Sequence, residues 1–287
     1  MKTKILALML VLVLVLSFGL VACQPTDAPV DDQNKEANIT DDNQTPAEDE
    51  TPADDEVPAD QPEEDDNVIV MATNAYFKPY EYYEGEKIVG IDAEIAEAIA
   101  QKLGMTLQIS DMQFDTILTA VQEGSVDFGM AGMTVTEERL ESVNFTSSYA
   151  SGVQSIIVKE GSPIASVDDL YAEGAAYKVG VQLGTTGDIY STDDFGAENV
   201  VQYSNGNEAV LALAGGSVDC VIIDNEPAKA LVAANEGLVI LETAYAEEDY
   251  AICVAKANTE LLDKLNAAID ELIADGTIDN IVDKYIK

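Results

Sequence analysis

The 287-residue chain has no histidine and no tryptophan, and its 14 basic residues include a single arginine. Without histidine, the usual Ser-His-Asp and Cys-His nucleophile pairs and histidine metal ligands are excluded. The basic residues face 54 acidic ones, which gives a formal net charge of −40. Because phosphate backbones are bound by clusters of lysine and arginine, this charge argues against nucleic acid as a partner. No cysteine or carboxylate spacing in the sequence indicates a metal, and we expect no cofactor.

The first of only three cysteines, Cys23, ends a segment typical of an export signal. Lys2 and Lys4 precede an apolar run from Ile5 to Phe18, and "LVAC" then leads to Cys23. The ending resembles the lipobox of bacterial lipoproteins. That resemblance implies a signal peptide over residues 1–22 and acylation of Cys23, which would anchor the protein on the extracytoplasmic face of the cell membrane. An uncleaved membrane anchor is the alternative.

Residues 23–66 are poor in large apolar side chains and repeat Asp, Glu, Thr, Pro and Ala, as in "DDNQTPAEDETPADDEVPADQPEEDD". Such a segment buries too little surface to offset the entropy lost when its backbone is ordered. Repulsion among its acidic residues also extends it. We therefore predict a disordered acidic tether that begins at the lipidated Cys23.

The other two cysteines, Cys220 and Cys253, lie inside apolar runs that are typical of strands. Export permits a disulfide between them. However, cysteines on strands can pair only if their β-carbons face each other. Buried free thiols that act as small hydrophobic side chains are the preferred interpretation, and a disulfide remains the alternative.

Strands and helices are predicted to alternate from residue 68 onward. Val68 to Met71 form a short apolar run typical of a strand covered on both faces. "GIDAEIAEAIAQKLGM" then has apolar residues at helical spacing, with Gly104 as a plausible C-cap. This β-α alternation predicts a mostly parallel sheet with right-handed crossovers and ligands at the carboxyl ends of its strands.

The same alternation starts again at "QSIIVKEGS" and continues through "YKVGVQLGTTGDIY" and "VDCVIIDNEPAKALVAAN". The chain closes with the strand "YAICVAK" and an amphipathic helical pair. Two α/β units in about 220 residues exceed the usual size of one hydrophobic core. Two lobes with a ligand-binding cleft between them are therefore expected.

Several segments resemble, in order and spacing, those of the polar amino-acid-binding proteins, the family 3 solute receptors of ABC importers. They are "ATNAYFKPYEY", "VGIDAEIAEAIAQKLG", "AGMTVTEER", "NFTSSYASG", "VGVQLGTTGD" and "IIDNEP". The resemblance implies a two-lobed, periplasmic-binding-protein-like type II fold with mixed sheets and two hinge crossings. Lobe 1 would comprise residues 67–150 and 250–287, and lobe 2 residues 151–249. The hinges would lie near residues 149–153 and 247–250.

The resemblance also assigns a role to Arg139, whose guanidinium is the only planar, permanently charged group in the chain. The matching arginine binds the α-carboxylate of the amino acid in a bidentate contact that lysine cannot reproduce. The backbone amides of Thr134 and Thr186 would also hold the carboxylate. Thr186 lies in the loop "LGTTGD", whose N–H groups suit an anion. The alternative is a surface ion pair of Arg139 with Glu137, Glu138 or Glu141.

Further positions are carried over to the α-ammonium group. The Gly132 carbonyl, the Thr134 hydroxyl and the Asp224 carboxylate would accept its hydrogen bonds. Two simpler interpretations remain open at this point. Asp224 in "DNEP" is also a suitable cap for the helix that follows it, and Gly132 is also a suitable turn glycine.

Recognition of the ligand side chain is assigned to Phe77 and Phe114, which match aromatic positions that sandwich it in the family. Core packing is the alternative for Phe114. Asn74 stands where many relatives carry aspartate, so a direct ion pair with a basic side chain is missing there. Gln182 is expected to make a polar contact. Asp92 is a possible second one, or else the cap of a helix starting at Ala93.

These inferences predict a lipid-anchored, monomeric receptor that closes its lobes around a free polar L-amino acid and delivers it to an ABC permease. It is not expected to be an enzyme. Two alternatives stay open, namely a dehydratase-like enzyme of the same fold with Glu94 or Asp92 as its acid, and a sensory module for a membrane kinase. The sequence does not fix which amino acid is bound.

Overall fold

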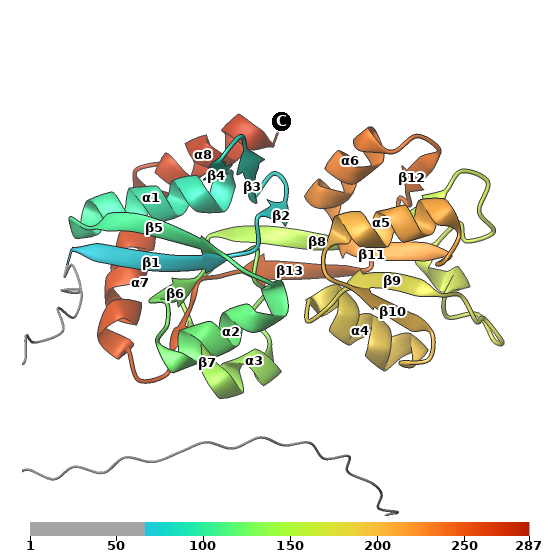
Figure 1. Ribbon diagram of the computed structural model, residues 1–287, viewed down its shortest axis with the longest axis horizontal. Helices are drawn as coiled ribbons and strands as arrows, with labels where there is room; N and C mark the ends of the chain where they lie inside the picture. Colours follow the sequence, from blue (N-terminus) through green and yellow to red (C-terminus); the bar gives the residue numbers. More distant parts are fainter. Residues whose placement is uncertain (1–66, 287) are drawn as a thin grey trace, which may run out of the picture. The chain divides into compact units, whose positions relative to one another are not determined.

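The computed structural model describes residues 67–286, which form two α/β lobes side by side (Figure 1). The predicted signal peptide, the acidic tether and Cys23 lie outside the described residues. Within residues 67–286, no helix is long and apolar enough to cross a membrane.

The first lobe is built on a five-stranded sheet with the order β5-β1-β6-β14-β7. β1 pairs in parallel with β5 and β6, whereas β14 is antiparallel to both of its neighbours. A small antiparallel sheet, β2-β3-β4, follows β1. The elements are β1 (Val68–Thr73), β2 (Tyr76–Phe77), β3 (Glu81–Glu84), β4 (Lys87–Val89), α1 (Ile91–Leu103), β5 (Thr106–Asp111), α2 (Phe114–Glu123), β6 (Phe128–Gly129), α3 (Glu137–Ser142), β7 (Val143–Phe145), β14 (Cys253–Ala255), α7 (Thr259–Ala274) and α8 (Thr277–Tyr285).

The second lobe contains a six-stranded sheet with the path β10-β9-β11-β8-β12 and with β13 paired to β8. β10, β9 and β11 are parallel, and β8 is antiparallel to β11, β12 and β13. Its elements are β8 (Ala150–Lys159), a 3-10 turn (Val167–Asp169), β9 (Val179–Gln182), α4 (Thr186–Phe195), β10 (Val200–Tyr203), α5 (Gly206–Gly215), β11 (Cys220–Asp224), α6 (Asn225–Ala234), β12 (Leu238–Ile240) and β13 (Ala246–Tyr250).

Two antiparallel strands connect the lobes. The chain enters the second lobe along β8 and returns along β13, with Ala150 opposite Tyr250 and Gln154 opposite Ala246. Both strands run through the middle of the molecule, from one lobe toward the other (Figure 1). After the return, β14, α7 and α8 complete the first lobe. The predicted two-lobed fold class with mixed sheets and two crossings is therefore confirmed.

Each lobe buries one cysteine in its own core. Cys253 packs with Ile117, Val121 and other residues of the first lobe, and Cys220 packs with residues of the second lobe. Both cysteines are free and fully buried, and burial raises the pKa of each thiol to about 12. The disulfide alternative is therefore wrong, because the two thiols lie in the separate cores of the two lobes.

Candidate functional site

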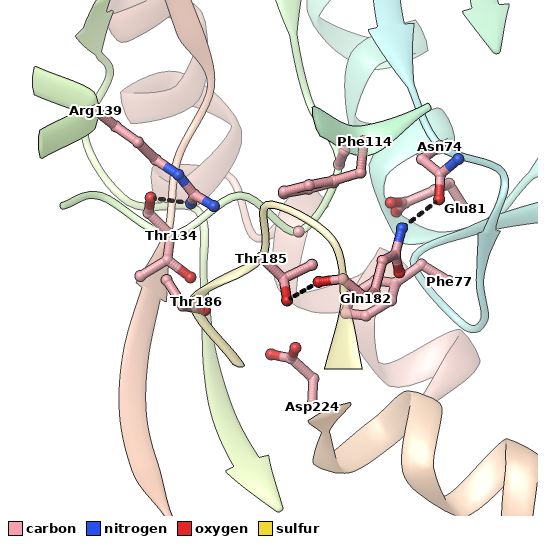
Figure 2. A pocket seen from close by; sticks show the side chains of 12 residues that line it. Asn74, Phe77, Glu81, Phe114, Thr134, Arg139, Gln182, Thr185, Thr186 and Asp224 are labelled. Atoms are coloured by element: carbon pink, nitrogen blue, oxygen red, sulfur yellow. Dashed lines mark hydrogen bonds between the residues drawn. The ribbon is translucent and has the colours of Figure 1, made fainter. Parts of the chain in front are cut away.

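A pocket with an empty volume of about 320 Å³ lies between the lobes. All the residues predicted to bind ligand, except Asp92, line it. Glu81, Ala131 and Thr185 line it as well and were missed by sequence reasoning. The lining residues are Asn74, Phe77, Glu81, Phe114, Ala131, Gly132, Thr134, Arg139, Gln182, Thr185, Thr186 and Asp224 (Figure 2).

Two hydrogen bonds join the lobes across this pocket. Gln182 Nε2, at the carboxyl end of β9, donates to Asn74 Oδ1 at 2.9 Å. Arg139 Nη2 donates to the Gly184 carbonyl oxygen at 3.0 Å. Because Asn74 and Arg139 belong to the first lobe, polar groups of both lobes meet at the same pocket.

Arg139 is held in the pocket by its own loop. α3 begins after Thr136, whose hydroxyl accepts the Arg139 backbone N–H at 3.1 Å. Arg139 is 5% exposed, and its Nη1 donates to the Thr134 carbonyl oxygen at 2.7 Å. The guanidinium also lies 5.5 Å from the centroid of the Phe114 ring. None of the ion pairs in residues 67–286 includes Arg139, so the surface ion-pair alternative is wrong.

The amino terminus of α4 lies at the same end of the pocket as Arg139. Thr185 caps this helix by accepting the Asp188 N–H, and Thr186 is its first residue. The first backbone amides of a helix have no partner within the helix and favour a negative group. Figure 2 shows Thr186 and Thr134 close to Arg139. This end of the pocket therefore presents hydrogen-bond donors suited to an anion.

Asp224 provides the opposite charge. It occupies the N-cap position of α6, but its side chain makes no capping hydrogen bond. Its carboxylate instead accepts hydrogen bonds from Gln154 Nε2, at 2.7 Å, and from the Tyr250 hydroxyl. Burial, and then the charge of Glu248, raise the pKa of Asp224 well above its usual range. The capping interpretation of this side chain is therefore wrong, and the carboxylate is fixed at the pocket wall.

Asp92 lies behind the pocket rather than in it. It is fully buried in the first turn of α1, where its Oδ2 accepts the Gly132 N–H and the Tyr149 hydroxyl, both at 2.8 Å. α1 begins at Ile91 with Gly90 as its N-cap. Both expectations for Asp92, a direct ligand contact and a helix cap, are thus corrected. Its carboxylate fixes the position of the Gly132 loop.

Gly132 meets the pocket where only glycine fits. Its φ is 53°, and a Cβ at this position would lie 2.7 Å from the ring of Phe77. We expect Gly132→Ala to lower the free energy of unfolding by about 1 kcal/mol or more and to weaken ligand binding by displacing Phe77. Chemical denaturation and ligand titration would measure the two effects.

Gly104→Ala is the matched control for this substitution. Gly104 has a similar positive φ, 71°, but nothing lies within 4 Å of its Cβ position. The control should share the backbone strain and keep normal ligand binding. Equal ligand affinity in the two variants would show that the contact with Phe77 does not shape the site.

The far end of the pocket, opposite Arg139, is lined by amide and carboxyl side chains rather than by the donors found around Arg139. Phe77 and Phe114 lie between the two ends, and Asn74, Gln182 and Glu81 lie at the far end (Figure 2). Phe114 also packs against the core of the first lobe, so its core-packing interpretation holds together with its place in the pocket wall.

Glu81 is the residue at the far end that sequence reasoning missed. The residue is 1% exposed, and neither of its carboxyl oxygens has a hydrogen-bond donor within the described part of the chain. Burial, followed by the charge of Asp92, raises the pKa of Glu81 well above its usual range. A buried carboxyl group without a donor is costly unless it meets a partner, so Glu81 gives this end of the pocket the capacity to accept a cation.

A pocket in which two lobes present an arginine, a helix amino terminus and separate carboxyl groups is typical of a two-lobed binding protein for small charged molecules. The chain belongs to the bacterial extracellular solute-binding proteins, family 3, whose family model matches residues 69–287. The membership expected from the quoted segments is confirmed.

Named relatives and solved structures agree with this membership. The chain is 32% identical over 226 residues to the arginine-binding extracellular protein ArtP of Bacillus subtilis (strain 168), covering 76% of this chain and 85% of ArtP. It is 39% identical, with a TM-score of 0.71, to an ancestral arginine-binding protein solved with arginine, covering 77% of this chain and 99% of the other. A second structure of an ancestral arginine-binding protein contains glutamine, and it matches with 39% identity, a TM-score of 0.71 and coverage of 77% and 98%.

Proposed function

We propose that this protein is the extracytoplasmic substrate-binding component of an ABC amino-acid importer and that it binds an L-amino acid with a cationic side chain, foremost L-arginine. The observation that carries the proposal is the polarity of the pocket. Donors gather around Arg139 at one end, the buried Glu81 lies at the other, and two phenyl rings lie between them. Arginine has a carboxylate, an apolar stem and a guanidinium in the same order.

The α-carboxylate is assigned to Arg139 and to the backbone amides of Thr134 and Thr186. A guanidinium has five N–H donors, and the hydrogen bonds to the Thr134 and Gly184 carbonyls engage one each of Nη1 and Nη2. The remaining donors suffice for a carboxylate. Their location in a buried pocket strengthens a charge-assisted contact relative to one in water.

The α-ammonium group is assigned to the Gly132 carbonyl, the Thr134 hydroxyl and the Asp224 carboxylate. The two donors that Asp224 already accepts, from Gln154 and Tyr250, hold its carboxylate in place and leave further lone pairs for a cation. An ammonium there would also relieve the repulsion that Glu248 exerts on Asp224.

The side chain of the ligand is assigned to the space between Phe77 and Phe114, with its cationic end at Glu81. Asn74 does not supply the carboxylate that many relatives carry at that position. Glu81 supplies a carboxyl group in the same part of the pocket instead, and the aromatic faces suit a guanidinium and its stem. The arginine-binding relatives named above support this choice of ligand.

Ligand capture is proposed to occur by hinge closure along β8 and β13. Each lobe supplies part of the polar site, so the ligand binds the closed arrangement better and shifts the population toward it. We further propose that the receptor acts as a monomer, that acylated Cys23 anchors it outside the cell membrane, and that a separate permease receives the ligand. The lipobox sequence supports the anchor.

The enzyme alternative named two acids that lie outside the pocket. It required Asp92 or Glu94, and neither residue lines the pocket. The Glu94 carboxylate instead accepts hydrogen bonds from the Lys284 ammonium and the Tyr285 hydroxyl of α8. Binding without catalysis therefore remains the proposal. A sensory role would use the same ligand, so copurification with a permease or with a kinase would distinguish these two partners.

Isothermal titration of the purified protein, freed of ligand and shown to be folded, against the twenty amino acids would test the proposed function. We expect L-arginine to bind most tightly, and small-angle scattering to show a smaller radius of gyration when it is added. If none of the amino acids binds, the receptor function is wrong. If a neutral amino acid binds and arginine does not, only the choice of ligand is wrong.

A further inference from the structure

Glu81 of β3, at the far end of the pocket, and Asp92 of α1, behind the pocket, form a pair of buried carboxyl groups. Glu81 is 1% exposed and Asp92 is fully buried. The two side chains lie within hydrogen-bonding reach of each other. If both groups are ionised, three of their four oxygens have no hydrogen-bond donor within residues 67–286. These are both oxygens of Glu81 and Oδ1 of Asp92. One proton on Glu81 would satisfy an oxygen on each residue.

The environment of the pair favours placing this proton on Glu81. Asp92 Oδ2 already accepts two hydrogen bonds, from Gly132 and Tyr149, which favour its ionised form. Burial raises the pKa of Asp92 to about 6, and these donors oppose the rise. Glu81 has no such donors, so burial and the charge of Asp92 raise its pKa well above the usual range.

The other charged groups around Glu81 are also acidic. Besides Asp92, the strongest charges that act on it are the carboxylates of Asp224, at the end of β11, and Asp111 of β5. Tyr80, the neighbour of Glu81 in the chain, and Tyr149, which contacts Asp92, stay neutral because burial raises the pKa of both. Arg139 lies at the opposite end of the pocket (Figure 2).

We propose that Glu81 carries a proton, donated to Asp92 Oδ1, unless a cationic side chain occupies the far end of the pocket, and that such a side chain enters by displacing this proton. The inference rests on the proposed function and makes Glu81 the residue that determines specificity. Neutral Glu81 accommodates a side chain with an uncharged amide or ureido group. Ionised Glu81 accommodates a guanidinium or an ammonium.

The exchange conserves charge and breaks no bond other than O–H. As a cationic side chain enters, the Glu81 O–H transfers its proton through water to the buffer. The two carboxylate oxygens then accept N–H groups of the ligand. The ligand side chain keeps its own proton and its positive charge. The cationic side chain therefore replaces the Glu81 proton as the positive group beside Asp92. A neutral ligand leaves the Glu81 proton in place.

The sign of the pH dependence follows from this exchange. Lowering the pH favours the protonated form of Glu81, which competes with a cationic ligand. Arginine affinity should therefore fall as the pH falls below the raised pKa of Glu81, by up to about tenfold per pH unit. Affinity for L-citrulline, which has nearly the shape of arginine but a neutral side chain, should not fall in this way. The preference for arginine over citrulline should rise with pH.

The protonated carboxyl group is tested first, without any ligand. Infrared difference spectra between the wild type and Glu81→Gln should contain the carbonyl band of a protonated carboxylic acid near neutral pH. Glu84→Gln is the matched control, because Glu84 lies on the same strand but is exposed; its difference spectrum should lack this band. Absence of the protonated band from the first spectrum would overturn the proposal, whether or not any ligand binds.

Proton release is tested by titrating wild-type protein with arginine and with citrulline in buffers of different ionisation enthalpy, from about pH 5 to about pH 8. Arginine binding is expected to release up to one proton per ligand more than citrulline binding, because any release at Asp224 is common to both ligands. Glu81→Gln should abolish this difference and reverse the preference for arginine. Arginine binding without proton release at any of these pH values, or equal release with both ligands, would overturn the proposal. The comparison of arginine with citrulline uses wild-type protein alone.

Discussion

Arg139→Ala is expected to weaken ligand binding by at least ~2 kcal/mol, or about 30-fold in Kd, because it removes a buried charge-assisted contact with the α-carboxylate. Arg139 is 5% exposed, and its guanidinium is fixed by the Thr134 and Gly184 carbonyls. It is the only basic residue among those that line the pocket, so no other side chain there can replace it. Isothermal titration with arginine measures the loss. Circular dichroism and thermal unfolding show whether the variant is folded.

Two further substitutions make this result specific. Arg139→Lys keeps the positive charge but loses the planar fork, so it should recover only part of the affinity. Lys229→Ala is the surface control, because Lys229 is 56% exposed and forms an ion pair with Glu226 on α6, outside the pocket; exposed pairs of this kind contribute little. Near-native affinity in Arg139→Ala would contradict the assignment of the carboxylate site.

Asp224→Asn is expected to weaken binding by at least ~2 kcal/mol and yet to make the ligand-free protein more stable at neutral pH. The loss of affinity follows from removing the counter-charge of the α-ammonium group. The gain in stability follows from the raised pKa of Asp224 in the folded protein. A carboxyl group whose pKa is raised by folding stabilises the fold at low pH, and this contribution is lost as the pH rises through the raised pKa. Asparagine removes the ionised form.

Thermal unfolding without ligand, followed by titration with arginine, would test both parts of this prediction. A rise in Tm of ~2 °C or more is expected, since about 1 kcal/mol shifts the Tm of a domain of this size by that amount. The control is Asp263→Asn on α7, an exposed position outside the pocket, which should change neither property. Unaltered arginine affinity in Asp224→Asn would exclude Asp224 from the ammonium site.

Much of the pocket was predictable because its residues follow strands in both α/β units. Asn74 comes after β1 and Asp224 ends β11, while Thr186 follows the loop after β9. Carboxyl ends of parallel strands meet at one edge of a sheet, so the order of motifs brings Thr186 and Asp224 together in the second lobe. Asn74 joins them because the first lobe faces the second across the pocket. The resemblance to a known family supplied the individual roles.

Glu81 and the buried role of Asp92 were not predictable in this way. Glu81 lies in "YEYYEGE", an acidic and aromatic stretch that is typical of an exposed hairpin. Only the pairing of β2 with β3 places Glu81 directly opposite Phe77 and thereby on the inner face. The partners of Asp92 are Gly132 and Tyr149, which are 40 and 57 residues away in the sequence. No local pattern reveals contacts of that range.

The cysteines illustrate the same limit. Apolar flanking residues correctly predicted that Cys220 and Cys253 are buried. Whether two buried cysteines face each other depends on which sheet each strand joins, and the return of the chain along β13 decides this. β14 then adds Cys253 to the first sheet, whereas β11 keeps Cys220 in the second.

The strands that connect the lobes also hold the pocket carboxylate. Gln154 on β8 donates from the same Nε2 to Asp224, at 2.7 Å, and to Glu248 on β13, at 3.0 Å. Tyr250, at the end of β13, donates its hydroxyl to Asp224 as well. A positive group arriving at Asp224 therefore changes the forces on both crossing strands at once. If the lobes close along β8 and β13 as proposed, the carboxylate that binds the ammonium group and the strands that bend share the same few hydrogen bonds, and no further element is needed to link binding to closure.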